Sequence, residues 1–185
     1  MITFKFNLLK TIQASAALLR KHGDCMDRMR LLKLLYIADR ELLAETGRTL
    51  TGDCVCAMEK GPVLSTVYDL IKGQGADAGA WQAVVQSRGS QVALAQATGF
   101  GNLTKAELFK AEDLCERYRD TDTEDLSKLT HEFAEWIDNY KTDRPPSSYP
   151  ITWDAVLVAQ DAGDLVDAVE ADIRDRDLVD AAFGG

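Results

Sequence analysis

The sequence predicts a mainly α-helical, compact domain built around one central apolar helix, with a small antiparallel β element. Three observations lead to this prediction. Residues 27–45 are apolar around most of a helical circumference, other segments repeat apolar residues every three or four positions, and only short stretches alternate as strands do. With 185 residues and 46% hydrophobic content, the chain has the size and composition of one globular domain.

Two helices are predicted in the first part of the chain. Residues 6–21 carry apolar side chains at helical spacing and are followed by Gly23, which readily adopts the left-handed conformation that ends a helix. Residues 27–45 carry two adjacent apolar stripes, and the polar residues left between them form one row, Arg30, Lys33 and Arg40. A helix of this kind lies at the centre of its domain rather than on its surface.

Asp39 is the unusual residue of this central helix, because its helical neighbours at three and four positions cannot ionise: Leu35, Tyr36, Leu42 and Leu43. Two interpretations are open. Either the helix turns Asp39 toward solvent, or the carboxylate is buried and must be hydrogen-bonded or ion-paired, since an unpaired buried charge is costly. The sequence offers four donors without choosing among them: Lys60, Tyr68, His131 and Trp136.

The middle of the chain predicts a short strand at residues 51–58 and then a helix. Gly61 is suited to cap that helix and Pro62 to be its first residue, because the missing N–H of proline costs nothing there. The helix is expected to end at Gly73 and to be followed by a loop over residues 73–80. A small antiparallel hairpin is predicted where residues 81–86 and 91–96 flank the turn SRGS.

The C-terminal half predicts further helices. Residues 103–120 open with a capping box from Thr104 to Glu107, and another helix is expected to continue through the segment THEFAEWIDNYK. The expected order of the remaining elements is a loop at 143–150, a short helix at 153–159 and a weakly amphipathic, Asp-rich helix at 161–183.

The formal net charge of −9 is distributed unevenly. Residues 150–185 contain nine acids and two arginines, whereas residues 1–48 contain five acids and nine bases. A nucleic acid is therefore not expected as the main ligand, because neutralisation of phosphates supplies most of that affinity. A basic protein partner suits this chain better.

The sequence contains no motif that predicts catalysis, a metal site or a cofactor. His131-Glu132 begins as a zinc-protease motif does, but Glu135 stands where the second histidine would be needed. The four cysteines are irregularly spaced and are expected to be reduced and mostly buried. No signal peptide or membrane helix is predicted, so a cytoplasmic location without a membrane partner is expected.

Three separated blocks of the sequence are similar to one known family. The segments LLKLLYIADRELLAETGRTLTGD, AMEKGPVLSTVYDLIKG and LTHEFAEW resemble, in this order, the Panacea domain, the SocA-like family of promiscuous antitoxins of bacterial and phage toxin–antitoxin operons. The resemblance covers roughly residues 5–160, so it implies an antitoxin domain at 1–160 followed by an acidic segment at 161–185 that is expected to be helical. The family's signature positions in this chain are Lys33, Tyr36, Asp39, Lys60, Gly61, Pro62, Val63, Tyr68, His131, Phe133 and Trp136.

The resemblance implies a non-enzymatic antitoxin, without a cofactor, that neutralises a protein toxin encoded nearby by binding it directly. Two alternatives stay open: an adaptor that delivers the toxin to a protease, and a small metal-dependent enzyme that uses His131. The chain end Phe183-Gly184-Gly185 is compatible with the adaptor. The signature residues are interpreted as an internal scaffold or a partner-binding site, in which Asp39 is expected to meet the Gly61-Pro62-Val63 segment or the His131-Glu132-Phe133 segment.

The acidic segment also has two interpretations. Its aspartates form either a solvated face that keeps the protein soluble or a surface that docks on a basic toxin and steers the association.

Overall fold

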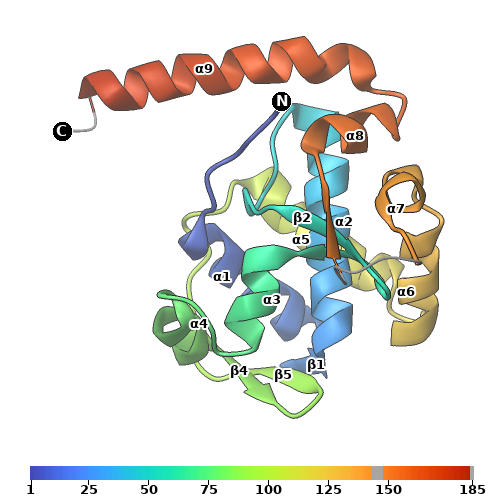
Figure 1. Cartoon of the computed structure of the whole chain (residues 1–185). Helices are drawn as coiled ribbons and strands as arrows, with labels where there is room; N and C mark the ends of the chain where they lie inside the picture. Colours follow the sequence, from blue (N-terminus) through green and yellow to red (C-terminus); the bar gives the residue numbers. More distant parts are fainter. Residues whose placement is uncertain (143–147, 184–185) are drawn as a thin grey trace.

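The computed structural model describes residues 1–142 and 148–183 and contains two small antiparallel sheets among its helices (Figure 1). It is 58% helix and 13% strand. The prediction of a mainly α-helical domain with one small antiparallel β element is therefore wrong: the fold is mixed α/β with two sheets, although helix predominates. The described part of the chain has no helix that is long and apolar enough to cross a membrane.

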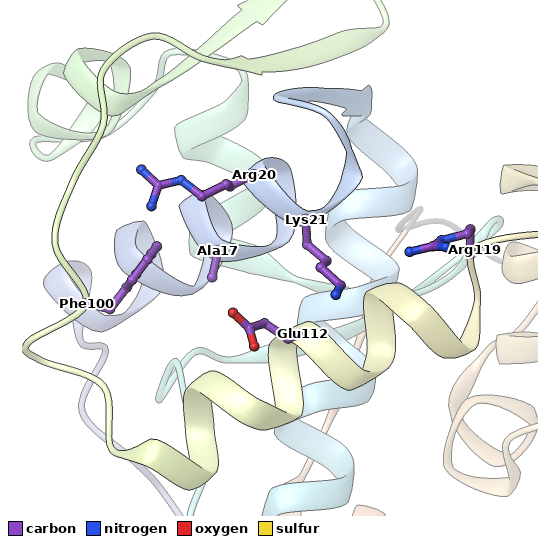
Figure 2. Close-up of a pocket in the computed structure, with 6 residues that line it drawn as sticks. All are labelled: Ala17, Arg20, Lys21, Phe100, Glu112 and Arg119. Atoms are coloured by element: carbon purple, nitrogen blue, oxygen red, sulfur yellow. The ribbon is translucent and has the colours of Figure 1, made fainter.

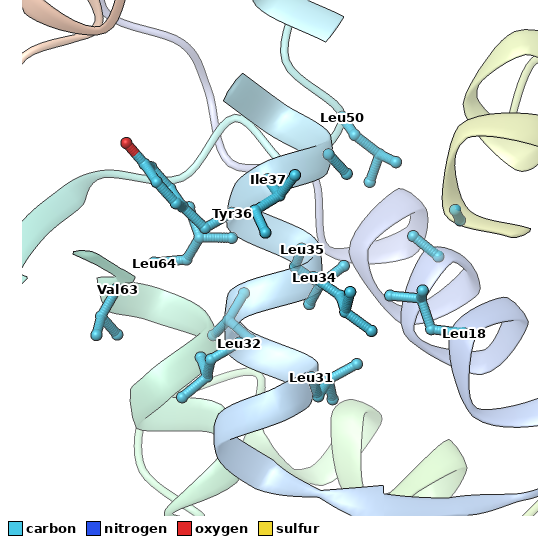
Figure 3. Packing of buried hydrophobic residues seen from close by; sticks show 14 of the residues in the cluster. Leu18, Leu31, Leu32, Leu34, Leu35, Tyr36, Ile37, Leu50, Val63 and Leu64 are labelled. Carbon is cyan, nitrogen blue, oxygen red and sulfur yellow. The ribbon is translucent and has the colours of Figure 1, made fainter. Parts of the chain in front are cut away.

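Helix α2 (Arg28–Thr46) is the centre of the fold, as its apolar circumference predicts. The Asp27 side chain caps its first turn by accepting from the Met29 N–H at 2.7 Å, and Gly47 ends it in the left-handed conformation. Helices α1 (Leu8–His22) and α5 (Lys105–Arg117) pack against it. Figure 3 shows α2 between Leu18 of α1 and Leu64 on its other side.

The polar row of α2 does not face solvent. Arg30 is 4% exposed, and its guanidinium donates to the backbone oxygens of Thr121, at 2.6 Å, and Tyr118. Lys33 is fully buried and Arg40 is partly buried. Buried donors of this kind need internal acceptors, and the structure supplies them from segments that are distant in sequence. Helix α2 is therefore enclosed on nearly its whole circumference.

The first sheet has the strand order β1-β5-β4, formed by β1 (Cys25–Asp27), β5 (Gln91–Leu94) and β4 (Val85–Arg88). The hairpin predicted around the SRGS turn is present as β4 and β5. Part of the predicted loop and the first predicted hairpin residues form helix α4 (Ala78–Val84) instead, because Trp81 is fully buried on that helix. Strand β1 is too short to be recognised in the sequence.

The second sheet has the order β3-β2-β6, formed by β3 (Gly61–Leu64), β2 (Val55–Met58) and β6 (Ser148–Ile151). The predicted helix start at Gly61 is wrong, since α3 (Ser65–Ile71) begins only after β3. An edge strand tolerates the missing N–H of Pro62. Strand β6 lies in the segment predicted as a loop, of which residues 143–147 fall outside the described residues.

The prediction that the four cysteines are mostly buried is wrong. The four cysteines are free, but only Cys115 is buried; Cys54 is exposed, and Cys25 and Cys56 are partly exposed. Val55 and Ala57 take the inward positions of the strand, so alternation places Cys54 and Cys56 on the opposite face.

The C-terminal helices frame the remaining sides of α2. The single helix predicted through THEFAEWIDNYK breaks into α6 (Thr123–His131) and α7 (Ala134–Asn139). After α8 (Trp153–Val158) and a short 3₁₀ turn, η1 (Gly163–Leu165), the last helix α9 (Val166–Phe183) lies along the outside of the molecule (Figure 1). The end Gly184-Gly185, on which the adaptor alternative draws, lies outside the described residues.

Candidate functional site

Three segments that are far apart in sequence meet on one side of α2 and bring most of the signature residues together. Helix α2, the β2–β3 turn and the α6–α7 segment contribute to what we call the signature cluster: Lys33, Tyr36, Gly61, Pro62, His131, Phe133 and Trp136. Its members are linked through side chains and through the backbone of the turn.

Lys33 occupies the buried end of the cluster. Its Nζ donates to the Pro62 carbonyl at 2.8 Å, and the side chain has no exposed surface. Burial lowers the pKa of Lys33 to about 7, since a charged ammonium loses its hydration there. The hydrogen bond from Lys33 to the Pro62 carbonyl of β3 joins α2 to the β2–β3 hairpin.

Gly61 allows the hairpin to approach Lys33 this closely. Its φ of +94° is in the left-handed region, and a Cβ placed there would clash with Thr130 Oγ1 and lie 2.7 Å from Lys33 Nζ. The position therefore needs glycine for its backbone conformation and for the space around it. Thr130, which comes from α6, is a member of this contact that the sequence analysis missed.

Replacement of Gly61 by alanine is expected to lower the free energy of unfolding by about 2–4 kcal/mol, because left-handed strain and overpacking add together. Chemical denaturation measures the change. Gly89→Ala is the matched control, since Gly89 also has a positive φ (+65°) but no atom within 4 Å of the position that a methyl group would take. Equal losses in the two variants would show that the close approach at Gly61 has no energetic importance.

Tyr36 forms the middle of the cluster together with two residues that the sequence analysis did not select. Its hydroxyl donates to Glu135 Oε1 at 2.7 Å, and Arg40 Nε donates to the same oxygen at 2.6 Å. Burial and the Glu135 carboxylate raise the pKa of Tyr36 well above its ordinary value. The Arg40 guanidinium also lies 4.1 Å from the centroid of the Phe133 ring, a cation–π contact. Arg40 and Glu135 thus lock α7 onto α2.

An aromatic stack forms the outer, half-buried side of the cluster. The His131 and Trp136 rings stack at 4.3 Å, and Trp136 stacks on Tyr140 at 4.9 Å. The Trp136 indole N–H donates to the Met58 carbonyl at 2.9 Å and so joins α7 to strand β2. Burial, together with the nearby Lys33 charge, lowers the pKa of His131. The lowered pKa favours the neutral form of the His131 ring in this stack.

Asp39 is buried, but its hydrogen-bond partners lie outside the signature cluster. Its Oδ1 accepts from the backbone N–H groups of Leu50 at 2.6 Å and Thr51 at 2.9 Å, and its Oδ2 accepts from the Thr51 hydroxyl. The expectation that Asp39 meets the Gly61-Pro62-Val63 or His131-Glu132-Phe133 segment is wrong. The carboxylate instead holds the segment that follows α2. Burial raises the pKa of Asp39 to about 7, although the three hydrogen bonds act in the opposite direction and lower it.

A different carboxylate, that of Asp53, holds the first turn of α3, the helix after the β2–β3 hairpin. Its side chain accepts from the backbone N–H groups of Thr66, at 3.1 Å, and Val67, at 2.9 Å, in the first turn of α3. Asp53 is 1% exposed. The sequence analysis missed this role of Asp53. Asp53 precedes strand β2, and it reaches the start of α3 only because β2 and β3 pair as a hairpin that brings the chain back.

The remaining signature positions occupy three different environments. Lys60 is exposed in the β2–β3 turn, where its carbonyl accepts from the Ser127 hydroxyl at 2.8 Å. Val63 is a buried core residue of β3. Tyr68 lies on α3, and the Lys72 ammonium lies 4.1 Å from the centroid of its ring.

A surface hollow of about 300 Å³ lies apart from the signature cluster, between α1 and α5 (Figure 2). It is lined by Ala17, Arg20, Lys21, Phe100, Glu112 and Arg119. Arg20 lies over the Phe100 ring at 5.4 Å, while Lys21 and Arg119 both pair with Glu116. Within residues 1–142 and 148–183, no group of three His, Cys, Asp or Glu side chains is arranged to hold a metal ion.

A family model described as "Antitoxin SocA-like, Panacea domain" matches residues 31–137, which is more than half of the chain. Comparison with curated proteins and with solved structures gives no match. The matched segment begins in α2 and ends in α7, so it contains every residue of the signature cluster.

Proposed function

This chain belongs to the SocA-like Panacea domain family of antitoxins, and from this premise we propose that it neutralises a cognate protein toxin by binding it directly. The observation that carries the proposal is the coincidence of the family match with the elements that build the signature cluster. The toxin itself is expected to be encoded beside this chain, and the complex is expected to form in the cytoplasm.

The contacts of the cluster favour a scaffold over a reaction centre. Lys33 is engaged by the Pro62 carbonyl, and Glu135 is engaged by both Tyr36 and Arg40. These groups have no exposed surface for a substrate to reach, apart from the partly exposed Arg40. We therefore assign the signature residues to fixing how α2, the β2–β3 hairpin and α6–α7 pack, so that the surface around them is rigid for partner binding.

We further propose that residues 1–160 form the antitoxin domain and that 161–185 form an acidic extension of it. The extension is attached through Val169, which is 4% exposed, and through the Arg48–Asp172 and Lys5–Asp177 ion pairs at 3.5 and 2.6 Å. Direct binding to a protein requires no cofactor, and a chain of net charge −9 does not favour a nucleic acid or an anionic membrane as partner.

Co-expression with the adjacent reading frame tests the proposal. If the neighbour arrests growth, this chain is expected to restore growth, and the two purified proteins are expected to form a complex that lacks the toxin's activity. An unrelated toxin of similar potency is the control. Growth arrest that persists despite expression of both proteins would contradict the antitoxin role.

The same experiment separates direct neutralisation from delivery to a protease. Direct binding predicts that the toxin level, followed by immunoblot, stays constant while growth recovers. It also predicts inhibition with the two purified proteins alone. A toxin that disappears during recovery, and that stays active in the purified mixture, would support the adaptor alternative.

A further inference from the structure

The last helix, α9, has one face that packs on the domain and one that does not. Val166, Val169 and Ile173 recur at steps of three and four and pack against the core. Beyond Ile173 every described residue of the helix is exposed. Figure 1 shows α9 on the outside of the molecule, with its side away from α2 uncovered.

The side of the helix opposite these three residues carries a second series, which we call the outer seam: Ala168, Ala171, Leu178 and Ala182, with Asp175 between them. Ala171 is half-buried, and the other members of the seam are exposed. Its steps of three, four, three and four residues are those of a helix that packs along another helix. Leu178 is 69% exposed, and the adjacent Val179 is 56% exposed. A helix that exposes such residues and contains many aspartates gains little from propensity alone, so a partner that covers the seam would stabilise it.

The charges of α9 divide between the same two faces. Glu170, Asp172 and Asp177 face the N-terminal part of the chain, where they pair with the Met1 amino group, Arg48 and Lys5 respectively. The two arginines of the helix are already paired one turn back, Arg174 with Glu170 at 3.6 Å and Arg176 with Asp172 at 3.0 Å.

The negative charges of Asp167 and Asp175 are not balanced by a neighbouring cation in the described part of the chain. They are exposed, and among residues 1–142 and 148–183 neither has a hydrogen-bond or ion-pair partner. Asp175 interrupts the outer seam, so a facing helix would need a cation at that point, in the way that a single polar residue sets the register of a coiled coil. The uncovered face therefore combines exposed apolar side chains with two unpaired carboxylates.

We propose that the outer seam of α9 binds a basic amphipathic helix of the toxin, with a lysine or arginine opposite Asp175. This assignment rests on the proposed antitoxin function and adds the chemistry of the partner surface. A second copy of this chain fits less well, because two outer seams placed face to face would bring Asp167 and Asp175 of each copy against like charges.

Two variants of the full chain test the seam with the protein from the adjacent reading frame as the probe. Asp175→Lys reverses the seam charge and replaces a poor helix former by a better one, so α9 is preserved. Leu178→Asp removes the apolar contact. Each is expected to raise the Kd for the probe at least tenfold, and Asp175→Lys is expected to reduce the dependence of Kd on salt.

Each variant has a matched control on another surface. Asp120→Lys makes the same charge change at an exposed acid after α5, and Phe109→Asp makes the same polar change at an exposed apolar residue of α5. Both controls are expected to stay within twofold of the unmodified Kd. Circular dichroism of all four variants checks that helix content is retained.

The outcomes separate this assignment from the proposed function. If the unmodified chain neither binds the probe nor restores growth, the antitoxin function fails and the seam assignment fails with it. If the unmodified chain binds but both α9 variants bind within twofold, only the seam assignment is overturned. Sedimentation equilibrium that detects a dimer of the chain alone, dissociated by Leu178→Asp, would assign the seam to a second copy and would also overturn it.

Discussion

Replacement of Asp39 by alanine is expected to lower the free energy of unfolding by about 3–5 kcal/mol at pH 6, as measured by chemical denaturation. The change removes the acceptor of the Leu50 and Thr51 N–H groups and of the Thr51 hydroxyl, and it leaves these donors buried. It also releases the segment that carries the chain from α2 to strand β2. A loss below half a kcal/mol would show that the carboxylate is merely solvated.

Asp39→Asn is the control that keeps an acceptor and removes the charge. It is expected to cost less than alanine, because its amide oxygen can still accept from both backbone N–H groups. The folded pKa of Asp39, about 7, is raised above the ordinary value of 3.8, so the native state binds a proton that the unfolded state has lost. The contribution of Asp39 to the free energy of unfolding is therefore expected to fall as the pH rises from about 4 to about 7. In the asparagine variant, this decrease in unfolding free energy between pH 4 and pH 7 should be absent.

Replacement of Lys33 by methionine is expected to remove a pH dependence of the opposite sign. Its folded pKa of about 7 lies below the ordinary value of 10.5, so between these values the unfolded state binds the proton and the native state does not. Stability linked to Lys33 is therefore expected to rise with pH from about 7 to about 10.5, by up to about 5 kcal/mol. Below pH 7 the buried ammonium imposes its full cost, so the methionine variant should be more stable than the unmodified protein there.

The measurement is the difference in unfolding free energy between the two proteins from pH 6 to pH 10. Subtraction cancels the other groups that titrate in this range. Lys60→Met is the control for removal of a lysine, because Lys60 is exposed in the adjacent turn. The methionine variant loses the hydrogen bond to the Pro62 carbonyl at every pH, so this loss alone gives a constant difference in unfolding free energy. A difference that stays constant from pH 6 to pH 10 would therefore contradict a lowered pKa of Lys33.

Helices with strong local signals could be predicted from the sequence. The ends of α2 follow from Asp27 and Gly47, and the start of α5 follows from the capping box of Thr104 and Glu107. These features act within one helical turn, so a single sequence contains them. The hairpin of β4 and β5 belongs to the same class, because its two strands are joined by a short turn.

Strands β1 and β6 could not be predicted, since each pairs with a strand that is far away in the sequence. Strand β1 pairs with β5, which lies more than sixty residues later, and β6 pairs with β2 across nearly half of the chain. Strand β3 was missed for a different reason, because it follows β2 across a short turn but begins with Gly61 and Pro62. The same two residues that suit a helix start also suit an edge strand, and only pairing with β2 decides between them.

The signature cluster shows the same division between local pattern and tertiary contact. The three sequence blocks contain Lys33, Tyr36, His131 and Trp136, but the hydrogen bonds that join the cluster run from one block to another, from Lys33 to the Pro62 carbonyl and from Trp136 to the Met58 carbonyl. Glu135 was missed although it stands beside Trp136, because its partners on α2 are about a hundred residues away. The role of the cluster as a scaffold for toxin binding stays a prediction.

By itself, the sequence determined the central helix, the uneven charge and membership of the antitoxin family, because each is written in the order of residues along short segments. Only the tertiary structure decided that the polar row of α2 is buried, that Asp39 holds the chain at Leu50 and Thr51, and that α9 leaves one face uncovered. The physical reason is that burial and hydrogen bonding depend on which distant segment supplies the neighbouring surface.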